Sequence, residues 1–170
     1  MRLHVLATGL ALSLTALACP AQPKLGCTDT PHRQFDFWVG QWDVTTPDGK
    51  PAGTNRIESI AQGCALLEHW EGRGGFSGKS LNTYDATDQR WHQEWVDAAG
   101  GRLSLTGGWS GSQMVLEGTL PDDKQPGRLV KQRISWTPQT DGSVRQLWQT
   151  SADDGKSWDV AFDGKYVRKK

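Results

Sequence analysis

Aromatic and amide side chains alternate in this chain in a way that suits the binding of small molecules. Within the segment 90–97, Trp91, Gln93 and Trp95 share one face of an extended strand, because successive side chains point to opposite sides. Indole faces beside amide groups can stack on a planar or sugar-like molecule and hydrogen-bond to it. The same indoles can also simply fill a core, so both interpretations stay open.

Strand alternation extends this face to neighbouring segments. Lys79, Arg90, Glu94 and Arg145 mark the side that faces solvent, so their alternate neighbours should point inward. A plain packed core would show Val, Ile and Leu at those positions. The residues predicted to line one internal cavity are Trp70, Asn82, Tyr84, Trp91, Gln93, Trp95, Gln146 and Trp148, with Glu68 beside them.

Glu68 is the one candidate for acid–base chemistry. If it lies inside, it needs a partner, because a buried unpaired charge is very costly, and Arg133 is the partner considered. Glu68 could then be structural, could anchor a polar ligand, or could act as a general acid or base after burial raises its pKa. The sequence contains no nucleophile elbow, phosphate-binding loop or dinucleotide fingerprint that would support catalysis.

Metal and cofactor signals are weak. His32, His69 and His92 show neither H-x-H nor H-E-x-x-H spacing, so we expect no metal site and no cofactor. The segment 151–158, S-x-D-x-G-K-S-W, matches the Asp box of sialidase propellers, a turn that stabilises a hairpin and has no catalytic role. Its last residue, Trp158, is expected to help fill the interior.

Length and charge restrict the class of protein. The chain has 170 residues, enough for one domain with its own core. Nineteen basic and nineteen acidic residues give a net charge of zero, which offers no electrostatic surface for nucleic acid.

Residues 1–21 predict an export signal. A short basic start precedes the uncharged apolar run 5–18, which is too short to span a bilayer comfortably. Cleavage is expected after Ala18 or Ala21, which leaves a periplasmic or secreted protein with no membrane span. The alternative is a lipoprotein anchored through Cys19. In an oxidising compartment Cys27 and Cys64 predict one disulfide, although two free thiols are also compatible with the sequence.

Residues 22–170 predict a single all-β domain. Short strand-like runs, separated by Gly, Pro, Asn and Asp turn signals, favour an up-and-down antiparallel barrel of about ten strands, because closure removes both sheet edges. A short helical turn is expected at 31–38. The predicted strands are 41–46, 53–60, 64–71, 77–84, 89–97, 102–107, 112–118, 128–137, 143–151 and 157–168.

The block FDFWVGQWDV at 35–44 resembles the opening of the exported bacterial DUF1579-type family, whose function is unknown. More broadly, the G-x-W element at Gly40 and Trp42 is similar to that of the calycin barrels, which include lipocalins and nitrobindin-like haem proteins. This likeness implies that Trp42 on the first strand and Arg168 on the last lie together and close one end of the barrel. Nitrobindin-like proteins use a late histidine to bind haem. No histidine follows His92 here, so haem is not expected.

These features favour an exported calycin-like barrel that binds an unidentified small polar-aromatic or amphipathic molecule in its cup. One alternative is a small barrel enzyme, a hydrolase or isomerase that uses Glu68 as acid or base. The other is a structural or interaction module of the cell envelope.

Overall fold

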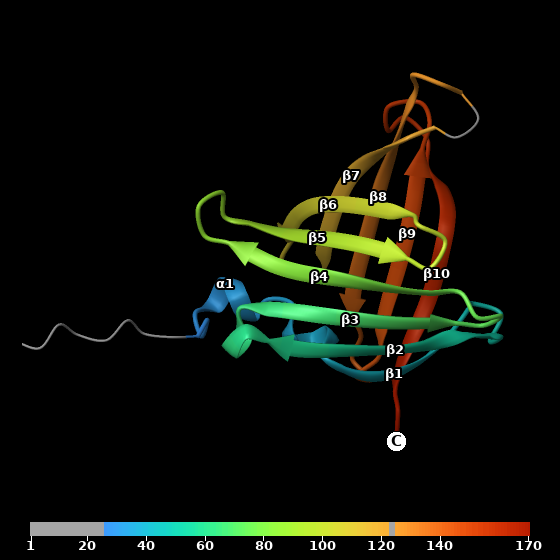
Figure 1. Cartoon of the computed structure of the whole chain (residues 1–170). Coiled ribbons are helices and arrows are strands. Elements are labelled where there is room, and N and C mark those ends of the chain that lie inside the picture. The colour runs from blue at the N-terminus through green and yellow to red at the C-terminus, as the bar shows by residue number, and fades with distance from the viewer. Residues whose placement is uncertain (1–25, 123–124) are drawn as a thin grey trace, which may run out of the picture.

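Ten antiparallel strands close into one barrel in the computed structural model, which describes residues 26–122 and 125–170 (Figure 1). The predicted leader 1–21 and Cys19 lie outside the described residues. The strands are β1 (Gly40–Thr45), β2 (Pro51–Ile60), β3 (Ala65–Gly72), β4 (Ser77–Asp85), β5 (Arg90–Asp97), β6 (Arg102–Trp109), β7 (Met114–Pro121), β8 (Leu129–Pro138), β9 (Val144–Ser151) and β10 (Asp159–Arg168). The predicted all-β, up-and-down barrel is confirmed, and its strand ends are shifted by only a few residues.

Within the described residues, three short helical segments accompany the strands: α1 (Thr30–Arg33), η1 (Asp36–Trp38) and η2 (Ala61–Gly63). The first two form the helical turn that was expected at 31–38. In Figure 1, β2 to β5 run across β8 to β10, and α1 covers the end of the barrel from which β3 starts. No helix within residues 26–122 and 125–170 has the length and apolarity needed to cross a membrane.

Each strand pairs with the next one in the chain, and β1 pairs with β10 to close the barrel. Trp42 lies opposite Arg168 in that last ladder. The Arg168 guanidinium carbon lies 4.4 Å from the centre of the Trp42 ring, and Arg168 Nη1 donates a hydrogen bond to the Val39 carbonyl at 3.0 Å. The predicted contact at the closed end is therefore confirmed.

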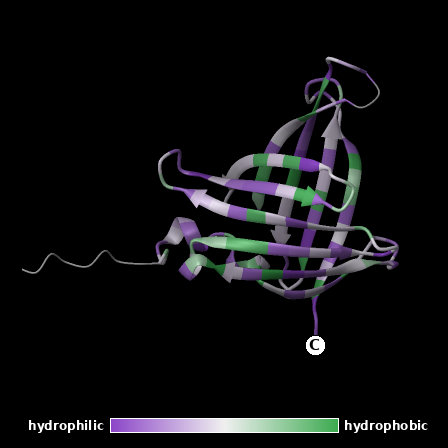
Figure 2. Cartoon of the chain, viewed as in Figure 1, coloured by the Kyte–Doolittle hydropathy of each residue, from purple (hydrophilic) through white to green (hydrophobic). Residues whose placement is uncertain are grey.

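An N-terminal arm plugs this closed end. Phe35 and Trp38 have no exposed surface, and their rings stack at 4.9 Å. The Phe35 ring also meets Trp136 at 5.1 Å and Trp91 at 5.6 Å, both at steep angles. Along the strands in Figure 2, hydrophobic and hydrophilic residues interchange over short distances, as expected when one face packs inward and the other meets water. The closed end is thus a dense aromatic core.

A disulfide fixes the arm to the barrel. Cys27 and Cys64 are bonded, with their Cα atoms 4.8 Å apart, and the Cys27 amide donates to the Gln62 carbonyl at 3.2 Å. The predicted bridge is confirmed. It holds the arm against η2, the turn that leads into β3.

The segment 151–158 forms the structural turn that its Asp-box pattern indicated. Asp153 Oδ1 accepts hydrogen bonds from the Ser151 hydroxyl at 2.8 Å and the Ser157 amide at 2.9 Å. The Ser157 hydroxyl and amide, with Ser151, hold the pKa of the Asp153 carboxyl well below its ordinary value. The expectation for Trp158 is wrong, because its indole lies beneath Arg133, 3.9 Å from the guanidinium carbon, on the outer face of β8. The predicted strand 157–168 includes Trp158, but β10 begins only at Asp159, so strand alternation does not apply to Trp158.

Candidate functional site

A cavity of about 320 Å³ lies inside the barrel, toward the end that the arm does not plug. Its volume is at the lower end of the range for small-molecule sites. Aromatic rings from Trp70, Trp95, Trp148 and Phe162 form much of its wall, with Leu103 and Ile134 between them. Glu68, Gln93, Gln146 and Tyr166 supply polar groups. The start of β2, the end of β3 with the loop after it, and the start of β10 complete the lining with Ala52, Gly72, Arg73, Phe76 and Ala161.

Six of the predicted residues line this cavity: Glu68, Trp70, Gln93, Trp95, Gln146 and Trp148. Asn82, Tyr84 and Trp91, which were predicted to share it, are not part of its lining. Trp91 packs against Phe35, and Tyr84 meets the His32 ring at 5.0 Å. Alternation gives the face of a strand and not the depth along it, and the arm fills the depth at which Tyr84 and Trp91 lie.

Glu68 is held by two neutral donors. Glu68 is buried, with only 4% of its surface exposed. Its Oε1 accepts a hydrogen bond from Asn55 Nδ2 at 2.7 Å, and its Oε2 accepts one from the Ser80 hydroxyl at 2.6 Å. Burial raises the pKa of Glu68 above its ordinary value, and these two hydrogen bonds offset only part of that effect.

Arg133, the partner considered from the sequence, does not reach Glu68. It forms an ion pair with Glu117 at 2.6 Å across the β7–β8 ladder. Gln132 and Ile134, its neighbours on β8, are buried, so alternation places Arg133 on the outer face.

The donors around Glu68 belong to a longer polar chain. Gln93 Nε2 donates to Asn82 Oδ1 at 2.8 Å, Asn82 Nδ2 donates to the Ser80 hydroxyl at 2.9 Å, and Ser80 donates to Glu68. These three hydrogen bonds therefore all have their donors directed toward the carboxyl group. Such a chain polarises each of its members and favours the ionised form of Glu68.

Tyr166 lies on the opposite side of Glu68 and completes the polar region. Its hydroxyl donates to Gln146 Oε1 and lies 3.5 Å from Asn55 Nδ2, which can donate to it. Burial raises the pKa of Tyr166 well above its ordinary value, and the negative charge of Glu68 raises it further. Tyr166 therefore stays protonated and can act as a hydrogen-bond donor.

Asn55, Ser80 and Tyr166 were absent from the predicted site. Ser80 shares the inward face of its strand with Asn82, so the alternation that selected Asn82 could have found it. Arg56 marks an outward position on its strand, so its neighbour Asn55 should point inward, as Ile57 does. Lys165 indicates in the same way that its neighbour Tyr166 points inward. Alternation therefore indicates that these three side chains point inward. It does not show whether their polar groups belong to a binding site or only support the structure.

The aromatic wall has its own supports. Trp148 Nε1 donates to Gln132 Oε1 at 2.8 Å, and the Trp70 and Phe162 rings meet edge to face at 6.0 Å. Trp95 lies directly over Gly78, where a Cβ atom would come within 2.1 Å of the Trp95 ring atom Cζ2. The absence of a side chain at Gly78 is therefore what lets this indole lie against β4.

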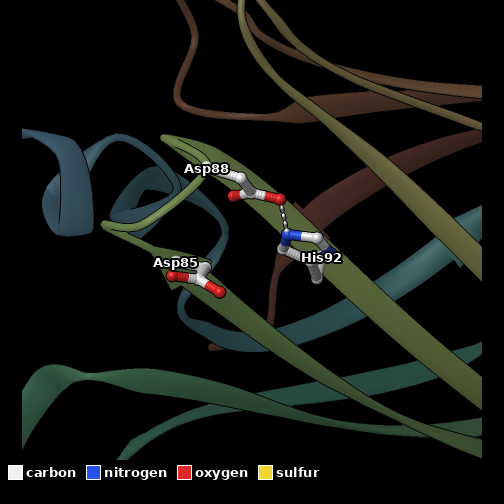
Figure 3. Close-up of side chains that lie close together, drawn as sticks. All are labelled: Asp85, Asp88 and His92. Carbon is white, nitrogen blue, oxygen red and sulfur yellow. Dashed lines mark hydrogen bonds and ion pairs between the residues drawn. The ribbon is translucent and has the colours of Figure 1, made fainter.

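A second cluster lies outside the cavity, where β4 turns into β5. The possible ligand atoms of Asp85, Asp88 and His92 lie within 4.8 Å of one another, and Figure 3 shows the contact between Asp88 and His92. His92 Nε2 lies 2.9 Å from Asp88 Oδ2, while Asp85 Oδ1 accepts the Thr87 amide at 2.7 Å. The spacing of the histidines in the sequence gives no indication of these aspartates. The hydrogen bonds that Asp85 and Asp88 accept from backbone amides of the turn account for the position of these carboxylates.

No protein-family model matches this chain, and no curated protein matches it. The closed ten-strand barrel is compatible with a calycin-like fold. The likeness to the DUF1579-type family rests on the sequence blocks alone.

Proposed function

We propose that this protein binds a small polar-aromatic or amphipathic molecule inside its barrel. The observation that carries the proposal is the cavity of about 320 Å³, which four aromatic residues line together with a buried carboxyl group. A protein that needed only a stable core would lose dispersion contacts at such a space and would have to satisfy each buried polar group.

We place this binding in the periplasm or outside the cell. The Cys27–Cys64 disulfide is typical of oxidising compartments, and the pattern of residues 1–21 predicts export. The FDFWVGQWDV block supports a relationship to the exported DUF1579-type proteins.

Two tryptophans on β5 provide a matched test. Trp95 lines the cavity, whereas Trp91 lies on the same face of the strand but packs in the closed end. The neutral dye N-phenyl-1-naphthylamine serves as the probe, and its fluorescence is titrated with each protein. We expect Trp95→Ala to weaken dye binding about tenfold while it lowers the free energy of unfolding by about 1–2 kcal/mol. Trp91→Ala should cost about 3–5 kcal/mol, because its indole is fully enclosed.

Equal affinity of the wild type and Trp95→Ala for the dye would contradict the proposal, as would an absence of dye binding by the wild type. Native mass spectrometry of the protein purified from its own envelope would identify the natural ligand as a retained mass.

A catalytic role is the second candidate, because the raised pKa of Glu68 coincides with a position on the cavity wall. A protonated carboxyl group can donate its proton to a leaving group, and Tyr166 offers a further hydroxyl nearby. Ester hydrolysis and enolisation assays should then show turnover that falls about 10²-fold or more in Glu68→Gln. Turnover that Glu68→Gln retains would exclude Glu68 as the acid or base.

A further inference from the structure

We propose that the molecule bound in this cavity carries a protonated amine, which pairs with Glu68 while its apolar part packs between the tryptophans. This inference rests on the proposed binding function and adds the charge of the ligand to it. Three features of the site support it: a carboxyl group without a counter-charge, amide oxygens without donors, and the faces of aromatic rings.

The cavity holds a carboxyl group with no protein counter-charge. Among the ion pairs of residues 26–122 and 125–170, none includes Glu68, whose partners are the neutral Asn55 and Ser80. A buried carboxylate is stabilised most by a cation at contact distance. A cationic ligand would supply this missing partner.

Two amide oxygens in the polar network around Glu68 accept no hydrogen bond from the described residues; Gln93 lines the cavity, and Asn55 lies behind its wall, bonded to Glu68. Asn55 Oδ1 is buried and has no hydrogen-bond partner among the described residues. No group in the described part of the chain donates to Gln93 Oε1, since the amide nitrogen of Gln93 makes both of its hydrogen bonds. An ammonium group brings three N–H donors and no acceptor, which complements a carboxylate with amide oxygens nearby.

The walls also favour a cation. The face of an aromatic ring carries the negative part of its quadrupole and attracts an ammonium group within about 6 Å. Trp70, Trp95 and Trp148 line the cavity together with Glu68. An anion would meet the same ring faces and the carboxylate, and both would repel it.

Arg73 is the only other charged residue that lines the cavity within the described residues. It is exposed in the loop after β3, whereas Glu68 is buried on that strand. Its charge is therefore screened by water, and that of Glu68 is much less so. When Glu68 is ionised, its carboxylate therefore acts on a bound molecule more strongly than the Arg73 guanidinium does.

Three probes of nearly equal size separate these possibilities: 2-phenylethylamine, 2-phenylethanol and 3-phenylpropionate. Calorimetric titration at pH 7 measures their affinities for the protein with its disulfide intact. We expect the amine to bind at least about tenfold more tightly than the alcohol, and the carboxylate to bind most weakly.

Glu68→Gln should reduce the preference for the amine over the alcohol to about threefold or less. Glu94→Gln is the matched control, because it makes the same chemical change on the outer face of β5, where the side chain is 59% exposed. It should keep the wild-type preference. Arg73→Gln removes the other charge of the cavity lining and should raise the amine affinity, because a cation no longer repels the ammonium group, and so provides a test if Glu68→Gln does not fold.

Each other outcome overturns the inference. If the alcohol binds as tightly as the amine, and Trp95→Ala weakens both, the cavity is a binding site but the ligand charge is wrong. If the carboxylate binds best and Arg73→Gln weakens it, the site selects an anion. A Glu68→Gln protein that keeps the amine preference removes Glu68 as its cause. If none of the three probes binds, both the inference and the proposed binding function fail.

Discussion

At the scale of the residue, Glu68 couples stability to pH. Burial raises its pKa in the folded protein above the ordinary value of 4.5. Below that value both the folded and the unfolded chain carry the proton, and Glu68 contributes its full stabilisation. As the pH rises, the unfolded chain loses the proton first and binds fewer protons than the folded chain. The free energy of unfolding therefore falls until the pH exceeds the folded pKa.

Glu68→Gln should remove this dependence. Compared with the wild type at the same pH, the variant should gain free energy of unfolding as the pH is raised from about 4 to 8. Urea denaturation at several pH values measures this difference, and the contributions of other carboxyl groups cancel in it. Glu94→Gln makes the same chemical change on the outer face and is the control for the substitution itself. A difference that stays constant with pH for Glu68→Gln would show that burial does not raise the pKa of Glu68.

At the scale of the element, β4 shapes the cavity through a missing side chain. Gly78 leaves the space that the Trp95 indole fills, so the backbone of β4 sets the position of one cavity wall. Glycine in a strand commonly marks such a close approach. Strand alternation predicted that Trp95 points inward but could not show that a neighbouring glycine holds it at the cavity.

Gly78→Ala should push the Trp95 ring out of position, because the new Cβ would lie within 2.1 Å of ring atom Cζ2. We expect a lower free energy of unfolding, a changed tryptophan emission maximum and weaker binding of N-phenyl-1-naphthylamine. Gly108→Ala in β6 is the control, since its Cβ would meet nothing within 4 Å. If both variants behave alike, the contact between Gly78 and Trp95 does not position the ring.

The same limit of strand alternation explains which parts of the site could be predicted. Turn residues recur at regular spacing, so the strands and the barrel followed from the sequence, and the inward faces followed from outward charges such as Lys79 and Glu94. The boundary between plug and cavity did not follow, because it depends on how far Phe35 and its neighbours enter the barrel. Glu68 takes its partners from the neighbouring strands β2 and β4, and Ser80 lies directly opposite it; the predicted strand order gives these neighbours but not the register that brings the side chains together.

At the scale of the whole molecule, closure depends on the ends of the described chain. Arg168 contacts the Trp42 ring and the Val39 carbonyl, so it joins the last strand to the first strand and to the residue that follows η1. Arg168→Ala should lower the free energy of unfolding by about 1–2 kcal/mol, because it removes a cation–π contact and a hydrogen bond. Urea denaturation measures the loss. Arg102→Ala, whose side chain is 74% exposed, is the control and should change stability by less than about 0.5 kcal/mol. Equal losses would show that the Arg168 contact does not support closure.

The β1–β10 ladder also decides how the protein behaves before it is complete. All other strand pairs join neighbours in the sequence, but this ladder pairs residues 42–45 with residues 165–168. Until those last residues are synthesised, the sheet has two free edges, and unpaired edges are templates for association with other chains. Cys27 and Cys64 can bond earlier, because β3 precedes most of the strands. A chain that ends before residue 165 should therefore retain its disulfide and yet aggregate.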